Sequence, residues 1–570
     1  MPEPARAGVG RPRAAGEKLI RQDLFLLGRL WTIDRASGED GSWSKREGTD
    51  GAGRPLRQSR WARVIAKILR PVAGVSAEAL EAGKRALVWD AAWASVTGAW
   101  SGGVVLVAFA LSLGADPMTI GLLAAIPFAA QAAQLPTIYL VERVRQRKLI
   151  GIASVGVARV IIVLLSLLPF IAATELRVPL LVTAHLLIAV LGSVAACAIN
   201  SWFHQLIPAH NLGAFFGKRL LVASALSCGG TLLAGLVVDH APHGRTGLAY
   251  AAVFIGAGLA GFASCVCLAR TPEPTMAAGG PTASMTQLLR EPLRDANFRR
   301  LLLMLGWWNL ASNLAAPFLT VYLIQQLGFG LSTVTTLWVS SQLANAAALY
   351  LWGRLSDRLS NKAILAVALP VYFVSLLGLV FAGAGMRGDM QLVVLYLLHV
   401  VMGVATGGIG LATGNIGLKL APQGKGTSYL AAIGTVSAVL GGAAPILGGA
   451  IAQWLSNSQL SIVVRWVSPS LLHEVSVVSF AHWEFLFALS ALLGLFVLRA
   501  LWRIDEGSDI SERVVIQELA LEALRTVNQL SSIGGLIGSV FSFSRITQWR
   551  QVAGRERRAV ERRIGDRRRG

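Results

Sequence analysis

Long apolar runs separated by short polar connections set the pattern of this chain. A helix needs about 20 apolar residues to cross roughly 30 Å of hydrocarbon, and the runs have about that length. They lie near residues 87–112, 117–140, 149–172, 178–200, 220–239, 247–269, 300–324, 332–352, 363–384, 390–416, 428–453 and 481–502. The pattern therefore predicts an all-α polytopic membrane protein with twelve transmembrane helices.

The composition excludes a soluble protein. The 570 residues are 54% hydrophobic and 15% charged, with a mean hydropathy of +0.57, whereas soluble proteins average about 25% charged residues. The cysteines, Cys197, Cys228, Cys265 and Cys267, all fall inside apolar runs, where thiols serve as small packing residues. We therefore expect no metal site and no cofactor.

The distribution of the +21 net charge predicts the topology. Alternate connections carry sixteen basic residues, namely Arg143, Arg145, Arg147, Lys148, Lys218, Arg219, Arg270, Arg290, Arg294, Arg299, Arg300, Arg354, Arg358, Lys362, Lys419 and Lys425. The remaining connections carry only Arg177, Arg245, Arg387 and Arg465. Because basic connections stay on the cytoplasmic side, we predict that these sixteen residues and both chain termini are cytoplasmic.

Both tails are basic. Residues 1–86 form an N-terminal extension with 17 Lys/Arg against 10 Asp/Glu, and residues 503–570 form a C-terminal tail with 13 against 9. Amphipathic stretches between Leu19 and Trp31 and over Arg60–Arg70 favour binding to anionic lipid headgroups. For the arginine-rich end, Arg555–Arg569, a solvated tail is an equal alternative, and nucleic acid is not an expected partner. The N-terminus lacks the pattern of a cleaved signal peptide.

The hydrophobic body repeats itself at an offset of 215 residues. Trp93 matches Trp308, Glu142-Arg143 matches Asp357-Arg358, Arg147 matches Lys362 and Asn200 matches Asn415. We therefore predict two six-helix bundles, 87–270 and 300–502, joined by a cytoplasmic linker, 271–299. Parallel repeats leave a cleft between them, and rocking about that cleft gives alternating access.

The run from Gly353 to Lys362, with Asp357-Arg358 at its centre, resembles the signature of the major facilitator superfamily. The first-half copy keeps Glu142-Arg143 and Arg147 but has Ile138 where the signature has glycine. The resemblance covers residues 87–502. It implies a bacterial type of transporter with the twelve-helix fold of that family, and it does not name a subfamily.

The resemblance also implies a conformational latch. Its predicted members are Glu142, Arg143, Arg147, Gly353, Asp357, Arg358 and Lys362. A carboxylate just past a helix end pairs across the cytoplasmic gap or caps a neighbouring helix, and it does so only while the gap is closed. The latch would favour the outward-facing state. The alternative is that these residues are merely positive-inside charges.

Polar side chains within the apolar runs are the candidate solute contacts, because they are costly in hydrocarbon. The family resemblance implies that helices one, four, seven and ten line a central cavity. The predicted contacts are Trp93, Thr97, Trp100, His185, Asn309, Asn313, Gln342, Asn345 and His399. Hydrogen bonds between packed helices explain the amides equally well, and a neutral histidine bonded to a backbone carbonyl is the alternative to a proton-carrying one.

Two further ionisable residues lie within the runs. Asp90, four residues into the first helix, is close enough to the surface to pair with Lys84 or Arg85. Arg159 lies deep in the third helix and requires a partner or water. We therefore treat Asp90 and Arg159 as candidates for ion coupling or for a structural ion pair.

The sequence predicts a secondary active transporter, or permease, for a small organic solute in the cell membrane, which in a bacterium is the inner membrane. Protons are a candidate second partner. An enzyme is not expected, since the chain has no G-x-x-x-x-G-K-[ST], H-E-x-x-H or G-x-S-x-G motif. The alternative function is a transporter-like scaffold or assembly factor without transport activity, whose tails recruit partners.

Overall fold

The computed structural model describes residues 70–208, 212–276, 290, 292–356, 360–384, 388–422, 425–468, 471–481, 483–506 and 517. Most of both tails, with the three segments predicted to lie on lipid or in solvent, falls outside these ranges apart from Arg70. Asp357 and Arg358 also fall outside them. The described residues belong to one unit, Ala66–Gly570.

The N-terminal half contains α3 to α10. Its elements are α3 (Ala77–Ser101), α4 (Gly103–Ser112), α5 (Pro117–Ala130), η1 (Gln131–Ala133), α6 (Gln134–Val144), α7 (Arg147–Leu165), η2 (Leu168–Phe170), α8 (Thr174–Leu206), α9 (Leu212–Asp239) and α10 (Thr246–Arg270). The first predicted helix is thus broken between α3 and α4. Gly103 has a φ of 51°, a conformation that only glycine adopts without strain.

The C-terminal half contains α12 to α17. Its elements are α12 (Ala296–Val321), the π-helical η4 (Tyr322–Gln326), α13 (Leu331–Ser356), α14 (Asn361–Ala384), α15 (Asp389–Lys419), α16 (Gly426–Trp454), β1 (Gln459–Ser468), β2 (Leu471–Ala481) and α17 (Trp483–Trp502). The largest apolar core runs through both halves and includes Phe109, Phe254, Phe318 and Tyr322.

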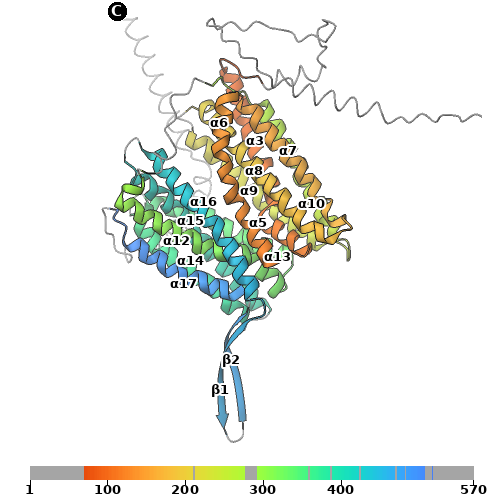
Figure 1. Cartoon of the computed structure of the whole chain (residues 1–570), viewed down its shortest axis with the longest axis vertical. Helices are drawn as coiled ribbons and strands as arrows, with labels where there is room; N and C mark the ends of the chain where they lie inside the picture. The colour runs from red at the N-terminus through yellow and green to blue at the C-terminus, as the bar shows by residue number, and fades with distance from the viewer. Residues whose placement is uncertain are drawn as a thin grey trace, which may run out of the picture. The chain divides into compact units, whose positions relative to one another are not determined.

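A β-hairpin corrects the all-α prediction. Strands β1 and β2 pair antiparallel from Gln459↔Ala481 to Ser468↔Leu471, with a register shift between Ile462 and Val463. Figure 1 shows the hairpin projecting beyond the helices. This connection is rich in valine, as strands are, but its apolar stretches are too short for a membrane span and were not predicted as an element.

Ten helical segments are long and apolar enough to cross a membrane. They are Ala77–Ser112, Pro117–Val144, Arg147–Phe170, Thr174–Leu206, Phe215–Asp239, Thr246–Arg270, Asn361–Ala382, Asp389–Lys419, Ser428–Trp454 and Trp483–Trp502. Helices α12 and α13 have 26 residues each but are richer in amides, hydroxyls and, in α12, arginine. The structure therefore confirms a polytopic helical protein with at least ten candidate spans among its described residues.

The helices run between two ends of the body. The end from which β1 and β2 project also carries the α4–α5, α9–α10 and η4–α13 connections, and we call it the hairpin end. The opposite end carries the start of α3, the α6–α7 connection and the end of α17, and we call it the terminal end.

Candidate functional site

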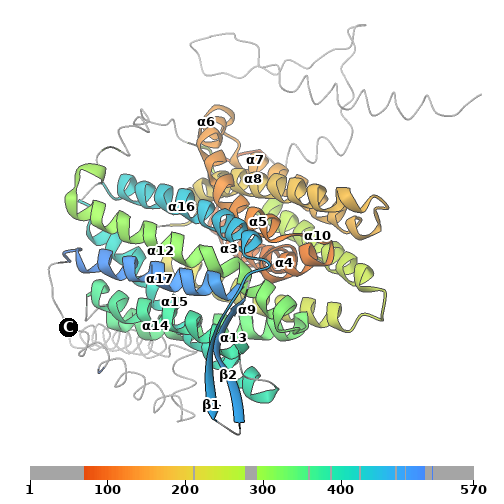
Figure 2. The ribbon, with the colours of Figure 1, turned by 60° about the horizontal axis from the view of Figure 1, so that its bottom comes forward.

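The two halves meet along α5 and α16, which lie side by side (Figure 2). A Cβ atom on Gly121 would collide with the carbonyl oxygen of Pro445, and one on Gly449 would lie 2.7 Å from the carbonyl oxygen of Pro117. Only glycine permits so close an approach. Because α5 begins and α16 ends at the hairpin end, this tight contact lies in the hairpin-end half of both helices.

A second contact between the halves joins α9 to α13. Asp239, the last residue of α9, accepts hydrogen bonds from the backbone N–H of Leu331 at 3.0 Å and of Ser332 at 2.7 Å. These N–H groups open α13 and have no partner within their own helix. The carboxylate of one half thus caps a helix of the other half at the hairpin end.

The other principal contacts between the halves pair α4 with α12, α4 with α13, and α5 with α12. Because α4 ends at the hairpin end, these contacts favour that end too. At the terminal end, α6 packs mainly against α8 of its own half, and its Glu142 and Arg143 are exposed. The halves are therefore joined chiefly through the hairpin end.

The predicted solute contacts on the first helix have two different surroundings. Trp93 keeps 40% of its surface exposed, whereas Thr97 is fully buried and donates to the carbonyl oxygen of Ala257 in α10. Trp100 donates from Nε1 to the carbonyl oxygen of Gly230 in α9 at 2.6 Å. Thr97 and Trp100 therefore pack α3 against its own half in this state.

The predicted amides of the second half lie on α12 and α13. Asn309 donates to Ser437 of α16 at 3.2 Å, and Asn345 donates to Thr406 of α15 at 3.1 Å. Asn313 is half-buried and donates to the carbonyl oxygen of Asn309, one turn earlier. Gln342 is exposed. Gln342 and Asn313 thus keep more freedom to meet a solute than the two amides that bridge helices.

The two histidines differ in burial. His399 is 5% exposed, and its Nδ1 lies 2.8 Å from the carbonyl oxygen of Leu395 in the same helix. His185 is half-buried and hydrogen-bonded to the backbone of Leu123 in α5. Both contacts fit a histidine bonded to backbone.

Asp90 lies in a buried polar cluster of the N-terminal half. Its carboxylate accepts from Arg219 of α9 at 3.1 Å and from the hydroxyl of Ser264 of α10 at 2.7 Å. Lys84, a predicted partner, instead pairs with Glu81 at 2.7 Å. Arg159 lies against Gly261 of α10, and its buried Nε has no hydrogen-bond partner among the described residues. The ion pair of this region is therefore Asp90 with Arg219.

The first-half latch residue Arg147 is buried in a network at the terminal end. Its backbone N–H donates to Glu273, just after α10, at 2.7 Å, and its guanidinium Nε lies 3.5 Å from the same carboxylate. The guanidinium also donates to Gln205 and to the carbonyl oxygens of Ser201 and Pro274. Arg147 thus ties the start of α7 to the end of α8 and to the segment after α10.

The second half repeats this arrangement around Glu506, just after α17. Its carboxylate accepts from the backbone N–H of Asn361 at 3.2 Å and of Lys362 at 2.7 Å, and from the side chains of Asn361 and Lys419. In both halves, a carboxylate that follows the last helix caps the third. The sequence patterns did not identify Glu273 and Glu506, although each occupies the same place in its half.

The environments of these two carboxylates shift their pKa values in opposite directions. Burial raises the pKa of Glu273 above its ordinary value, and the hydrogen bonds from Arg147 and Lys148 only partly offset this effect. Burial also acts on Glu506, but its hydrogen bonds from Lys362, Asn361 and Lys419 prevail and lower its pKa. The second cap therefore holds its negative charge more firmly than the first.

Gly353 and Lys362 are the predicted latch residues of the second half that the structure describes. Gly353, in the last turn of α13, has open space where a Cβ would stand, so it is not a close-packing glycine in this state. Lys362 contributes its backbone N–H to Glu506. No group of three or more His, Cys, Asp or Glu residues within the described ranges is arranged to hold a metal ion.

Residues 89–445 match the family model described as Major Facilitator Superfamily. Among curated protein sequences, none matches this chain.

Several solved structures share the fold. The nucleoside transporter NupG, in a mutant form, has a TM-score of 0.55 at 12% identity over 74% of this chain and 99% of that one. A bacterial homologue of the iron transporter ferroportin, in an inward-facing state, has a TM-score of 0.55 at 12% identity, over 75% and 99%. A D-xylose-proton symporter has 0.53 at 13%, over 75% and 97%. At such identities the similarity concerns the fold.

Proposed function

Since the chain belongs to the Major Facilitator Superfamily, a family of secondary transporters, we propose that it carries a small organic solute across a membrane by alternating access. The observation that carries this proposal is the placement of the contacts between the halves. The principal ones favour the hairpin end, at α5–α16 and α9–α13. Two bundles that are joined at the hairpin end can separate at the terminal end, and a rocking motion of one bundle against the other would close the terminal end.

The proposed topology has twelve crossings, with α12 and α13 added to the ten most apolar segments. Bundles 87–270 and 300–502 are joined by the linker 271–299, and the tails 1–86 and 503–570 extend from the body. The basic connections support a cytoplasmic terminal end, so this conformation is inward-facing. The proposed location is the cell membrane.

The proposed solute contacts are those predicted from the sequence. They fall into two groups, according to whether the side chain is free to meet a solute in this conformation. Trp93, Asn313 and Gln342 have exposed or half-buried side chains, so they would meet the solute in this conformation. Thr97, Trp100, Asn309, Asn345, His185 and His399 bond to neighbouring backbone or side chains and would act after rearrangement. Protons remain the proposed second partner.

We include in the proposed latch the two carboxylates that cap the third helix of each half. Glu273 and Glu506 fix the positions of Arg147 and Lys362 in their own halves. Glu142, Arg143, Gly353, Asp357 and Arg358 would then form the contacts that close the terminal end when the bundles rock. In the proposed inward-facing conformation these contacts would be broken, and the exposure of Glu142 and Arg143 supports this assignment.

Site-directed labelling tests the proposal. The purified chain is first screened against a solute library by thermal shift, and any stabilising solute is then assayed for uptake into proteoliposomes. A cysteine at Asn313, in a variant whose own cysteines are replaced by serine, should react with a membrane-impermeant reagent from the terminal-end side, and the stabilising solute should protect it. Labelling of Asn313→Cys from neither side overturns the proposal.

The scaffold alternative has its own discriminating measurement. A chain without residues 1–69 and 507–570 should retain uptake if the body is a transporter. If the body has no transport activity and deletion abolishes recruitment of partners to the membrane, the scaffold function is correct instead.

A further inference from the structure

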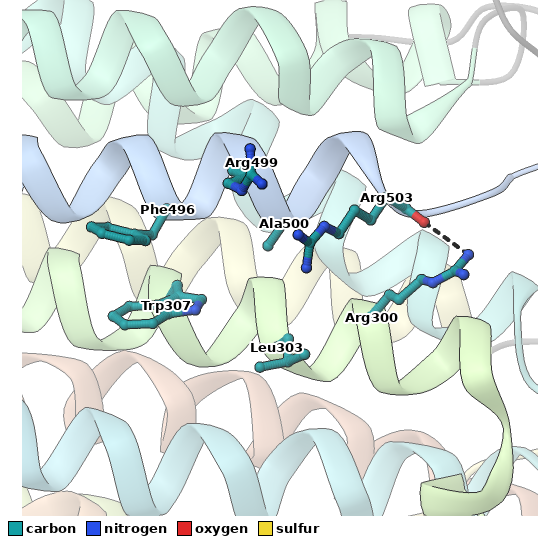
Figure 3. Close-up of a pocket in the computed structure, with 7 residues that line it drawn as sticks. All are labelled: Arg300, Leu303, Trp307, Phe496, Arg499, Ala500 and Arg503. Atoms are coloured by element: carbon teal, nitrogen blue, oxygen red, sulfur yellow. Dashed lines mark hydrogen bonds between the residues drawn. The ribbon is translucent and has the colours of Figure 1, made fainter.

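A basic groove lies between α12 and α17 at the terminal end. Its volume is about 630 Å³, and its lining includes Arg300, Leu303 and Trp307 of α12 together with Phe496 and Arg499 of α17 and Arg503 just after α17. Figure 3 shows the two aromatic rings facing each other at one end of the groove and Arg300 and Arg503 at the other. None of these residues belongs to the predicted solute or latch set.

The groove opens on the outside of the C-terminal half. Leu303 is 57% exposed and Phe496 51% exposed, and Leu492 and Leu495 extend this apolar surface along α17. Asn309, which bonds to α16, lies six residues from Leu303, or about 120° around the helix axis. The groove therefore belongs to a different face of α12 from the one that carries the proposed solute contacts.

Among the described residues, the positive charges of the groove have no acidic partner. Arg300, Arg499 and Arg503 are all exposed, and none of the carboxylates that the structure describes lies within 4.0 Å of their guanidinium groups. The one hydrogen bond between lining residues runs from Arg300 to the backbone carbonyl oxygen of Arg503 at 3.1 Å. Three like charges around one hollow repel each other, and a bound anion would relieve that repulsion.

The end of the groove away from Arg300 and Arg503 is aromatic (Figure 3). The rings of Trp307 and Phe496 stack at a centroid distance of 5.1 Å and an interplanar angle of 22°. Trp307 lies seven residues beyond Arg300, so the stack is about 10 Å further along the helix axis. A soluble anion would use only the arginines and would leave Leu303 and the stack uncovered. A phospholipid has both the anionic group and the apolar chain that this arrangement fits.

We propose that this groove binds one anionic phospholipid from the leaflet at the terminal end. Arg300, Arg499 and Arg503 hold its phosphate, and one acyl chain lies over Leu303 and the Trp307–Phe496 stack. The proposal rests on the membrane placement of the body given under the proposed function, and it does not require transport activity.

Native mass spectrometry of the full chain in neutral detergent tests this site. The protein is mixed with phosphatidylglycerol, with phosphatidylcholine of the same acyl chains, or with inorganic phosphate, and thermal unfolding is followed in parallel. We expect at least tenfold greater retention of phosphatidylglycerol than of phosphatidylcholine. R300Q/R499Q/R503Q should lose this preference. R270Q/R294Q/R299Q removes as many charges near the same end, outside the groove lining, and should keep it.

Two outcomes overturn the proposal. One is equal retention of phosphatidylglycerol by the wild type and by R300Q/R499Q/R503Q. The other is stabilisation by inorganic phosphate alone that this variant abolishes, because the occupant would then be a soluble anion. If the triple variant does not fold, R499Q replaces it, since Arg499 is exposed and makes no hydrogen bond to any described residue. Unchanged retention of phosphatidylglycerol by R499Q then overturns the proposal, and a severalfold loss of retention supports it. Uptake is not measured here, so failure of this site and failure of the transport proposal remain distinguishable.

Discussion

Asp239 and Ser332 connect the two halves of the molecule at the hairpin end. Oδ2 of Asp239 accepts from the backbone N–H of Ser332 at 2.7 Å and from its hydroxyl at 2.5 Å. A carboxylate at a helix N-terminus is stabilised by the free N–H groups and by the helix dipole. In the proposed alternating-access cycle this contact would form only while the halves are closed at that end, so it would bias the equilibrium between the two facing states.

Asp239→Asn should therefore shift that equilibrium. Losing the charge at the start of α13 removes about 1 kcal/mol, which lowers the relative population of the state closed at the hairpin end about fivefold. Electron–electron distance measurements between spin labels at Glu175 and Asp389, at the hairpin-end starts of α8 and α15, would show a larger fraction of long distances.

Asp116→Asn is the matched control for this change. Asp116 caps α5 within its own half through the N–H of Thr119 at 2.9 Å. Its substitution should leave the distance distribution unchanged. An identical shift in both variants would contradict a specific role for Asp239.

Gly121→Ala should hinder closure at the hairpin end. The added methyl group would collide with the carbonyl oxygen of Pro445, and such overpacking costs about 1–3 kcal/mol. The same spin-label distances should lengthen. Gly410→Ala on α15 adds the same group where no atom lies within 4 Å, and it should have no effect. If both substitutions act alike, the close approach of α5 and α16 does not control closure.

Glu506→Gln tests the cap with the lowered pKa. The folded state binds the proton of Glu506 less tightly than the unfolded state does. The stability that this carboxylate contributes is therefore present above its unfolded pKa of about 4.5. It is lost as the pH falls through the lowered pKa of the folded state. The difference in melting temperature between wild type and Glu506→Gln should shrink on acidification below about pH 4.5. A constant difference would contradict the cap.

Glu273→Gln should show the opposite dependence. The folded state binds the proton of Glu273 more tightly than the unfolded state, so its contribution is present below the unfolded pKa and is lost as pH rises through the raised folded value. The melting temperature of Glu273→Gln, relative to wild type, should therefore improve between pH 4.5 and neutrality. A relative melting temperature that falls over this range would contradict the assignment.

The pair of Asp90 with Arg219 can be tested by a double-mutant cycle. The carboxylate side chain is 5% exposed and the guanidinium side chain 26%, so removing one partner leaves a largely buried charge unpaired. Asp90→Asn should lower the free energy of unfolding by about 3 kcal/mol, and Arg219→Gln by somewhat less. The double variant should be more stable than the sum of the two losses implies. Additive losses would show that the pair is not coupled.

The sequence predicted the helices well because membrane spans depend on the length and apolarity of a run, which are local properties. It could not predict which face of a helix a residue occupies relative to its neighbours. Thr97 and Asn313 have similar positions in matching helices, yet Thr97 is fully buried against α10 and Asn313 is only half-buried.

The two caps show another limit. Glu273 and Glu506 follow the ends of helices and belong to no periodic pattern, so their role becomes visible only when a distant helix start lies beside them. The glycines of α15 likewise differ in ways that their spacing along the chain does not reveal. Gly403 and Gly407 of α15 approach α13, while Gly410 and Gly414, at the same spacing, approach nothing within 4 Å.

The β1–β2 hairpin has a practical consequence for imaging. Two helical halves inside a detergent micelle are hard to tell apart in projection, which makes single-particle orientations ambiguous. A ribbon ten to eleven residues long, or about 34 Å, breaks that resemblance because it marks one half and one face. The molecule thus carries its own fiducial for electron cryomicroscopy, at the face opposite the one where both termini of the helical body lie.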